Sequence, residues 1–145
     1  MGQQQLLVIV LVAIIVGIAT IIAINTFGSN MENKNRDAVQ EDLLRAASAA
    51  QGVWHRIESL GGAGQDFENS MTPKLLMERL HFSGTIDPDA PIVTNENAVY
   101  VLSDIEANGF TLTATPALWP FDIILVLERD TDTGSWIYEL SSGDD

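Results

Sequence analysis

From Leu6 to Ile24 the chain reads LLVIVLVAIIVGIATIIAI, an apolar run that only Gly17 and Thr20 interrupt. As an α-helix with a rise of about 1.5 Å per residue, this run is roughly 29 Å long, close to the hydrocarbon thickness of a bilayer. Its β-branched residues would favour a strand in water, but a lone strand in lipid leaves peptide groups unpaired at several kcal/mol each. The run therefore predicts a helix in a membrane or in an equally dry protein assembly.

This apolar segment is expected to stay in the protein rather than to act as a cleaved signal peptide. No Lys or Arg precedes it, and residues 25–30 offer no small-x-small cleavage pattern. Lys34 and Arg36 favour a cytoplasmic position for the flank that follows, but Glu32 and Asp37 lie among them. The orientation in a membrane is therefore left open.

All charged residues follow residue 30. Seven are basic and twenty are acidic, which gives the chain a net charge of −13. The basic residues are scattered rather than clustered, which argues against a nucleic-acid partner. The absence of cysteine excludes disulfides, thiolate metal sites and cysteine nucleophiles. We expect two parts, an apolar helix at residues 1–30 and one soluble domain at residues 31–145.

The apolar pattern changes to helical spacing after residue 31. Apolar residues recur at steps of three and four, which predicts an amphipathic helix: Val39, Leu43, Ala46, Ala47, Ala50, Val53, Trp54 and Ile57. Three glycines in residues 61–64 are expected to end this helix. One nearly continuous helix from about Leu6 to Leu60 is therefore predicted, and it is weakest at residues 25–30, which are poor helix formers.

The rest of the chain predicts a small sheet. Thr72 and Pro73 are typical of a helix start, and a short helix is expected to reach His81 with Leu75, Leu76 and Leu80 buried. A connection at residues 83–97 leads to four predicted strands at residues 98–103, 110–115, 122–129 and 135–140, joined by hairpin signals. The amphipathic helix is the long apolar surface available to cover them. The fold class is therefore α+β, with a long helix on a four-stranded antiparallel meander.

This layout resembles a type IV pilin or another member of the pilin-like superfamily. The resemblance rests on the uncharged helix that begins at Gln3-Gln4-Gln5-Leu6, on its amphipathic continuation, and on the strand NGFTLTATP at residues 108–116. The sequence departs from the family in two ways. Gln5 stands at the position of the usual glutamate if Met1 is the mature start, whereas Leu7 stands there if Gly2 ends a two-residue leader. The usual C-terminal disulfide loop is also absent.

The resemblance implies a function as the major subunit of a type IV pilus-like filament. Its partners would be copies of itself, the inner (cytoplasmic) membrane and the pilus assembly machinery, and it would move from storage in that membrane to the cell surface. Two alternatives stay open: a pseudopilin or minor pilin of a secretion or uptake system, and a single-pass, membrane-anchored binding protein of the cell envelope. Abundance would separate a major pilin from the first, and long-range helical assembly would separate it from the second.

Two sets of residues are the candidates for assembly. The helix core is predicted to use Gln5, Leu6, Val10, Ala13, Gly17, Ile21 and Ile24. A break of the helix under packing strain is predicted at Asn25, Gly28 and Asn30. The glutamines at residues 3–5 either hydrogen-bond to neighbouring subunits in a dry core or solvate a membrane interface.

No catalytic motif is recognised, so no enzyme activity and no cofactor are expected. Asp130 and Asp132 are weak calcium candidates, but a polar hairpin turn is the favoured interpretation because calcium takes six to eight oxygen ligands. His55 and His81 lie on separate predicted helices without a partner motif, and both are expected to be structural.

Overall fold

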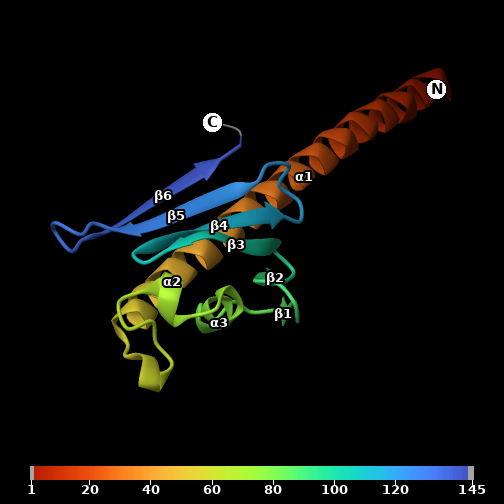
Figure 1. The fold of residues 1–145 in the computed structure, drawn as a ribbon. Helices are drawn as coiled ribbons and strands as arrows, with labels where there is room; N and C mark the ends of the chain where they lie inside the picture. Colours follow the sequence, from red (N-terminus) through yellow and green to blue (C-terminus); the bar gives the residue numbers. More distant parts are fainter. Residues whose placement is uncertain (1, 144–145) are drawn as a thin grey trace. The chain divides into compact units, whose positions relative to one another are not determined.

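A computed structural model describes residues 2–143, and its first helix, α1 (Gly2–His55), contains the whole apolar run (Figure 1). The chain divides into two compact units, with the boundary between Lys34 and Asn35. We refer to residues 2–34 as the apolar segment and to residues 35–143 as the head. Each is described by itself below. The sequence placed the boundary four residues earlier, between residues 30 and 31.

The head contains the remaining elements, which follow the last turns of α1. They are η1 (Glu58–Leu60), α2 (Phe67–Ser70), α3 (Pro73–Arg79), β1 (Thr85–Ile86), β2 (Ile92–Thr94), β3 (Ala98–Glu106), β4 (Gly109–Pro116), β5 (Ile123–Arg129) and β6 (Trp136–Ser142). The strands form one antiparallel sheet in the order β1-β2-β3-β4-β5-β6. The predicted α+β class and antiparallel meander are confirmed.

The prediction of four strands was too low. The two additional strands, β1 and β2, lie in the region that was expected to be an irregular connection. They are only two and three residues long, so the alternation of apolar and polar residues has no room to repeat. Pairing is what makes them strands: β2 pairs with β3, where Val93 lies opposite Tyr100 and is fully buried, and β1 pairs with β2.

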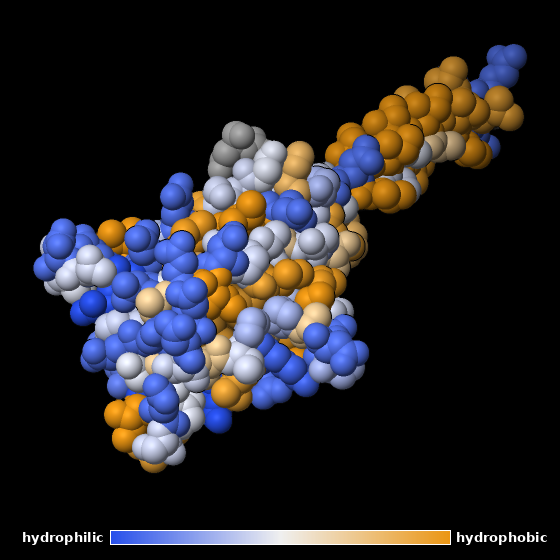
Figure 2. Space-filling model, viewed as in Figure 1, coloured by the Kyte–Doolittle hydropathy of each residue, from blue (hydrophilic) through white to orange (hydrophobic). Residues whose placement is uncertain are grey.

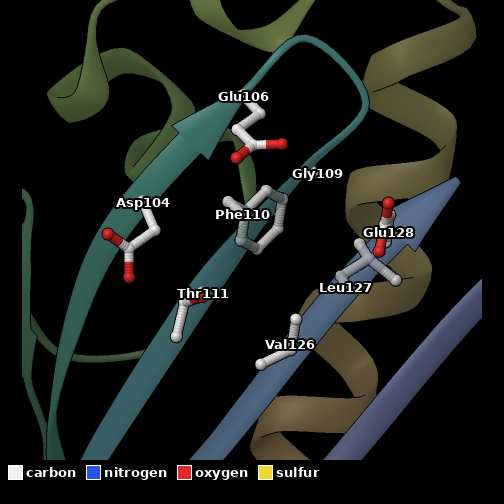
Figure 3. Close-up of a pocket in the computed structure, with 8 residues that line it drawn as sticks. All are labelled: Asp104, Glu106, Gly109, Phe110, Thr111, Val126, Leu127 and Glu128. Atoms are coloured by element: carbon white, nitrogen blue, oxygen red, sulfur yellow. The ribbon is translucent and has the colours of Figure 1, made fainter.

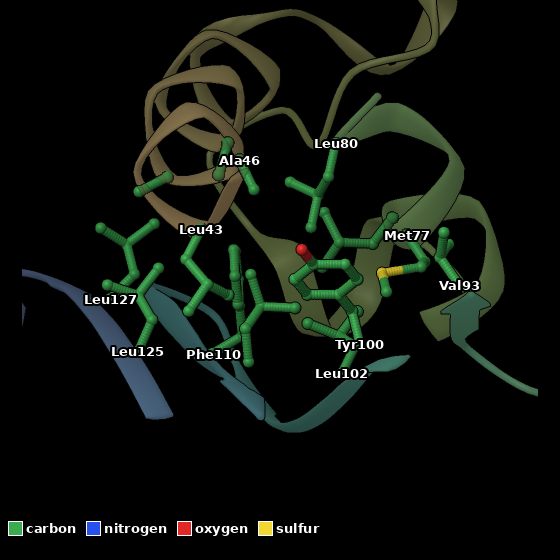
Figure 4. Close-up of a cluster of buried hydrophobic side chains, with 14 of the residues drawn as sticks. Leu43, Ala46, Met77, Leu80, Val93, Tyr100, Leu102, Phe110, Leu125 and Leu127 are labelled. Carbon is green, nitrogen blue, oxygen red and sulfur yellow. The ribbon is translucent and has the colours of Figure 1, made fainter. Parts of the chain in front are cut away.

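One apolar core holds the head together (Figure 4). Residues 39–54 of α1 supply Val39, Leu43, Ala46, Ala47, Ala50, Val53 and Trp54, all buried. The sheet supplies alternate residues, and in β4 Phe110, Leu112 and Ala114 are buried while the intervening threonines are more exposed. The predicted packing of the amphipathic helix on one face of the sheet is thus confirmed. Met77 of α3 is also fully buried, although the sequence pattern did not single it out.

The end of α1 differs from the prediction, which extended the helix to Leu60. The helix ends at His55, and Ile57 is 58% exposed rather than buried. The physical reason is that the glycine loop folds back onto the helix end, where backbone N–H groups of Ala63, Gly64 and Gln65 donate to the last carbonyls of the helix and its following turn. A Cβ at Gly62 would overlap the carbonyl oxygen of Arg56, so this close approach requires glycine.

The short helix α3 begins as predicted. The Thr72 hydroxyl accepts the backbone N–H of Leu75 at 3.2 Å, and Pro73 occupies the first helical position. The helix ends at Arg79, two residues before the expected end, because His81 adopts a positive φ of 58°. Leu76 and Leu80 are buried as expected, whereas Leu75 is half-buried.

Candidate assembly surface

The apolar segment exposes all of its described side chains. Every residue from Gly2 to Lys34 is exposed, and Asn35 is the first buried residue of the chain. The aliphatic residues of the run are between 50% and 68% exposed, from Val10 to Leu7 and Ile9. Figure 2 shows this segment as an almost unbroken apolar surface. A continuous aliphatic surface of this size is stable only when lipid or protein covers it.

Among the described residues 2–143, α1 is the one helix long and apolar enough to cross a bilayer. The same length and composition occur in signal sequences and in buried core helices, so this test alone does not show a membrane span. Here the apolar stretch of α1 is not buried at all inside the structure.

Six of the seven predicted helix-core residues share one side of the apolar segment. With about 100° of rotation per residue, Leu6, Val10, Ala13, Gly17, Ile21 and Ile24 all lie within a stripe about 80° wide. Gln5 projects about 100° from Leu6, away from the stripe centre. Ala13 and Gly17 are one turn apart, the spacing that permits close helix approach in apolar surroundings. No heavy atom lies within 4 Å of a Cβ placed at Gly17.

Thr20, which interrupts the apolar run, has its polar group satisfied locally. Its hydroxyl donates to the backbone carbonyl of Val16 at 2.7 Å. This is the usual bond of a threonine to the preceding helical turn. The hydroxyl therefore adds little cost when the segment enters lipid or a protein core.

The predicted helix break is not present in this structure of a single chain. Asn25, Gly28 and Asn30 all lie within the continuous helix α1. Their low helix propensities sum to only a few kcal/mol, which a long flanking helix on each side can offset. The break that was expected under packing strain in a filament stays a prediction about the assembled state.

The weak calcium candidates form a turn. The Asp130 carboxylate accepts the backbone N–H groups of Asp132 and Thr133 at 2.8 and 3.2 Å, and these bonds lower the pKa of Asp130. The backbone N–H of Asp130 donates to Ser135, which closes the hairpin between β5 and β6. Within residues 2–143 no group of three His, Asp or Glu side chains lies together as a metal site would require. These bonds form a polar hairpin turn, which was the favoured interpretation of the loop.

An open depression of about 280 Å³ lies on the sheet near the turn from β3 to β4 (Figure 3). Its lining residues are Asp104, Glu106, Gly109, Phe110, Thr111, Val126, Leu127 and Glu128. The pairing of β3 with β4 shifts register between Ser103 and Glu106, which accounts for the uneven surface. Three of the lining residues are carboxylates and none is basic, but within residues 2–143 these carboxylates do not form a group that could hold a metal ion.

The two histidines were expected to be structural, and their surroundings are compatible with that role. The His55 ring packs edge-on against Trp54, with ring centroids 4.9 Å apart, and more loosely against Trp136 at 6.4 Å. His81 occupies the left-handed position that ends the α3 turn. Neither belongs to a group of potential metal ligands in the part of the chain that the structure describes.

Sequence reasoning missed two polar residues on the buried side of α1, Asn35 and Asp42. Asn35 is 8% exposed, and the Asp42 side chain is 13% exposed. The two are seven residues apart, so they lie on the same helix face as Val39 and Ala46. This interruption of an apolar face by polar residues two turns apart was the signal available in the sequence.

Comparison with known proteins gives no relative. No family model matches the chain, and no curated protein and no solved structure is similar to it. The resemblance to pilins therefore rests on the layout and the quoted residues alone.

Proposed function

We propose that this protein is a structural subunit of an extracellular filament of the type IV pilus kind, and that it polymerises through its apolar segment. The observation that carries this proposal is the full exposure of every residue from Gly2 to Lys34, next to a head that already buries its own core. An aliphatic surface without a partner inside the chain must be covered by something outside it.

A filament and a membrane offer equivalent cover for this surface. In the cytoplasmic membrane the apolar segment would be surrounded by lipid, and in a filament core the segments of neighbouring copies would replace that lipid. The exchange costs little because both surroundings are apolar, while the small residues Ala13 and Gly17 permit close packing between helices. The subunit would thus be stored as a membrane protein and then transferred to the cell surface by the assembly machinery.

The head has the properties expected of the outer part of such a filament. The net charge of −13 lies entirely in residues 31–145, which keeps the surface of this part of the chain solvated. Its amphipathic helix and sheet share one core, so the head is a folded unit without any contribution from cysteine. The alternatives share these properties: a minor pilin or pseudopilin would act in smaller numbers, and an envelope binding protein would remain a monomer in the membrane.

The decisive experiment is negative-stain microscopy of material sheared from cells that make this protein, with mass spectrometry of the sheared subunit. Filaments whose main component is this chain would support the major-pilin function. The chain as a trace component would favour a minor pilin or pseudopilin. Its absence from sheared material, with the chain recovered as a membrane monomer, would overturn the filament proposal in favour of a simple anchor.

A matched pair of substitutions tests which side of the helix packs. Ala13→Leu enlarges a small residue on the stripe, whereas Ala19→Leu makes the same change on the opposite side. We expect Ala13→Leu to lower filament yield at least tenfold and Ala19→Leu to change it little, with both variants inserted equally in membranes. Equal yields from the two variants would exclude the stripe as the packing surface.

A further inference from the structure

Polar side chains on the buried face of α1 bind two turns of the sheet. Asn35 donates through Nδ2 to the carbonyl of Asn97 at 2.9 Å, and its Oδ1 accepts the backbone N–H groups of Leu118 and Trp119 at 2.9 and 3.1 Å. Its three partners thus belong to the turn before β3 and to the connection after β4. All the hydrogen-bonding capacity of this buried amide except one N–H is used.

Asp42, two helical turns further on, binds the same region of the sheet. Its Oδ2 accepts the Tyr100 hydroxyl at 2.6 Å, the Asn97 amide at 3.0 Å and the Asn95 amide at 3.4 Å. Its other oxygen lies 3.9 Å from the exposed guanidinium of Arg45. Figure 4 shows the Tyr100 hydroxyl at the core, on the side of the ring that faces the helix.

The turn that receives these bonds has hydrogen bonds of its own. Asn95 Oδ1 accepts the backbone N–H groups of Asn97 and Ala98 at 2.9 and 3.0 Å. The Tyr100 ring stacks on Phe82, with ring centroids 4.4 Å apart, and Tyr100 is fully buried. The Asn95 and Tyr100 side chains that meet Asp42 are therefore also held by contacts that do not involve α1.

We propose that these five residues, Asn35, Asp42, Asn95, Asn97 and Tyr100, form a clamp that fixes the axial position of α1 on the sheet. Apolar packing restrains this position only through the shapes of the side chains, because Val39, Leu43, Ala46 and Ala50 recur about every turn and differ in volume. The hydrogen bonds of the clamp add a directional restraint. A slide of one turn would carry the Asp42 carboxylate away from its three donors and leave it poorly paired in the core. Truncating one partner of such a group is strongly destabilising.

The consequence concerns force along the helix. Asn35 is the first residue of the head, so the clamp begins where any pull on the preceding helix enters it. With the clamp intact, a pull on the apolar segment moves the sheet together with α1. This holds whether the segment is bound by lipid or by other protein chains. This inference does not depend on filament formation, and it holds equally for a membrane-anchored monomer.

Hydrogen exchange of the full chain in detergent micelles tests the clamp. In Asp42→Ala we expect the amides of residues 36–50 in α1 to exchange at least tenfold faster, while those of β4 and β5 change by less than threefold. The matched control is Glu41→Ala, which removes the neighbouring carboxylate that binds Arg45 at 2.8 Å on the exposed face. This control should alter exchange in residues 36–50 by less than twofold.

Three further outcomes would overturn the proposal. A uniform acceleration across α1, β4 and β5 would mean that Asp42 only adds to global stability. Equal exchange rates of residues 36–50 in Asp42→Ala and Glu41→Ala would mean that the buried position of Asp42 has no effect. Because Asp42 and Tyr100 act on each other, the double variant Asp42→Ala/Tyr100→Phe should exchange no more than twofold faster than Asp42→Ala. If the exchange rates of the double variant rise by the product of the two single-variant factors, the two residues act independently and the clamp is contradicted.

If Asp42→Ala does not fold, Asp42→Asn replaces it, since the amide keeps the volume and one acceptor oxygen. Pulling the folded variant between its two ends then supplies a mechanical measurement. We expect the wild-type head to unfold in one step and the Asp42→Asn head to show an earlier step at lower force, as α1 slips before the sheet opens. A single step at an unchanged force would refute the clamp.

Discussion

Helix α1 runs through both the apolar segment and the head, but its side chains are exposed in the first and largely buried on one face in the second. Residues 2–34 and residues 35–55 all belong to α1, yet every side chain of the first range is exposed, whereas eight residues of the second are buried. The backbone hydrogen bonds are of the same kind in both parts, so they do not distinguish them. The difference shows that the side chains, not the backbone, decide which surroundings each part of the helix requires. Residues 35–55 find apolar surroundings in the core of the head.

The largest expected effect comes from separating the two regions. Deleting residues 1–30 removes the apolar surface of the helix. Each Leu, Ile or Val in it contributes roughly −0.3 to −0.6 kcal/mol to the free energy of membrane insertion at the bilayer centre. The remaining chain keeps its core and its charge of −13, and we expect a folded, soluble, largely monomeric head. Sedimentation and electron microscopy of residues 31–145 measure this. Filaments of normal diameter from that fragment would end the proposal that the apolar segment drives assembly.

The second prediction compares the same substitution in both regions. Leu43 is fully buried, and Leu43→Ala should lower the unfolding free energy of the head by about 2–5 kcal/mol. Leu11 is 52% exposed, and Leu11→Ala should change that free energy by less than about 0.5 kcal/mol. Denaturant unfolding of the head, followed in micelles by tryptophan fluorescence, measures both. Similar losses from the two variants would show that the regions are coupled rather than independent.

The third prediction sharpens the role of the first turn of α1. If Gln5 binds neighbouring copies through neutral hydrogen bonds, Gln5→Leu should lower filament yield while membrane insertion is unchanged. Assembly of the wild type should also vary little with pH at this position, because an amide does not titrate. The measurement is the ratio of sheared filament to membrane-bound subunit. A normal ratio in Gln5→Leu would remove Gln5 from the assembly mechanism.

The smallest expected effect lies inside the head, at Tyr100. Burial, and then its hydrogen bond to Asp42, raise the pKa of Tyr100 well above its ordinary value near 10. The folded state therefore holds this proton while the unfolded state loses it above about pH 10, so the contribution is complete below pH 10 and falls as pH rises. Between pH 9 and pH 11 the wild type should lose about 1 kcal/mol of unfolding free energy more than Tyr100→Phe. Parallel pH profiles for the two proteins would contradict this assignment.

Sequence periodicity predicted the head best where an element is long enough for its pattern to repeat. The alternation in β4 and the spacing of apolar residues from Val39 to Trp54 each placed the correct side chains in the core. The prediction was wrong for β1, β2 and the helix end near Ile57, where pairing between very short strands and the returning glycine loop decide the conformation. Of the candidate site, the sequence supplied the stripe on the apolar segment but missed Asp42, whose partners lie more than fifty residues away in the chain.

The sequence by itself determined that this protein has two different parts. The uncharged aliphatic helix needs apolar surroundings, and the acidic residues that follow it form a domain with its own core. These conclusions depend only on composition and on local period, because burial of aliphatic surface is non-directional and follows area. The tertiary structure decided where α1 ends, how many strands the sheet has, and which polar groups bind the helix to it. Those features depend on directional hydrogen bonds between particular groups, some close in the chain and some, as at Asp42, more than fifty residues apart. The periodicity of apolar residues does not record the directions and distances of such bonds.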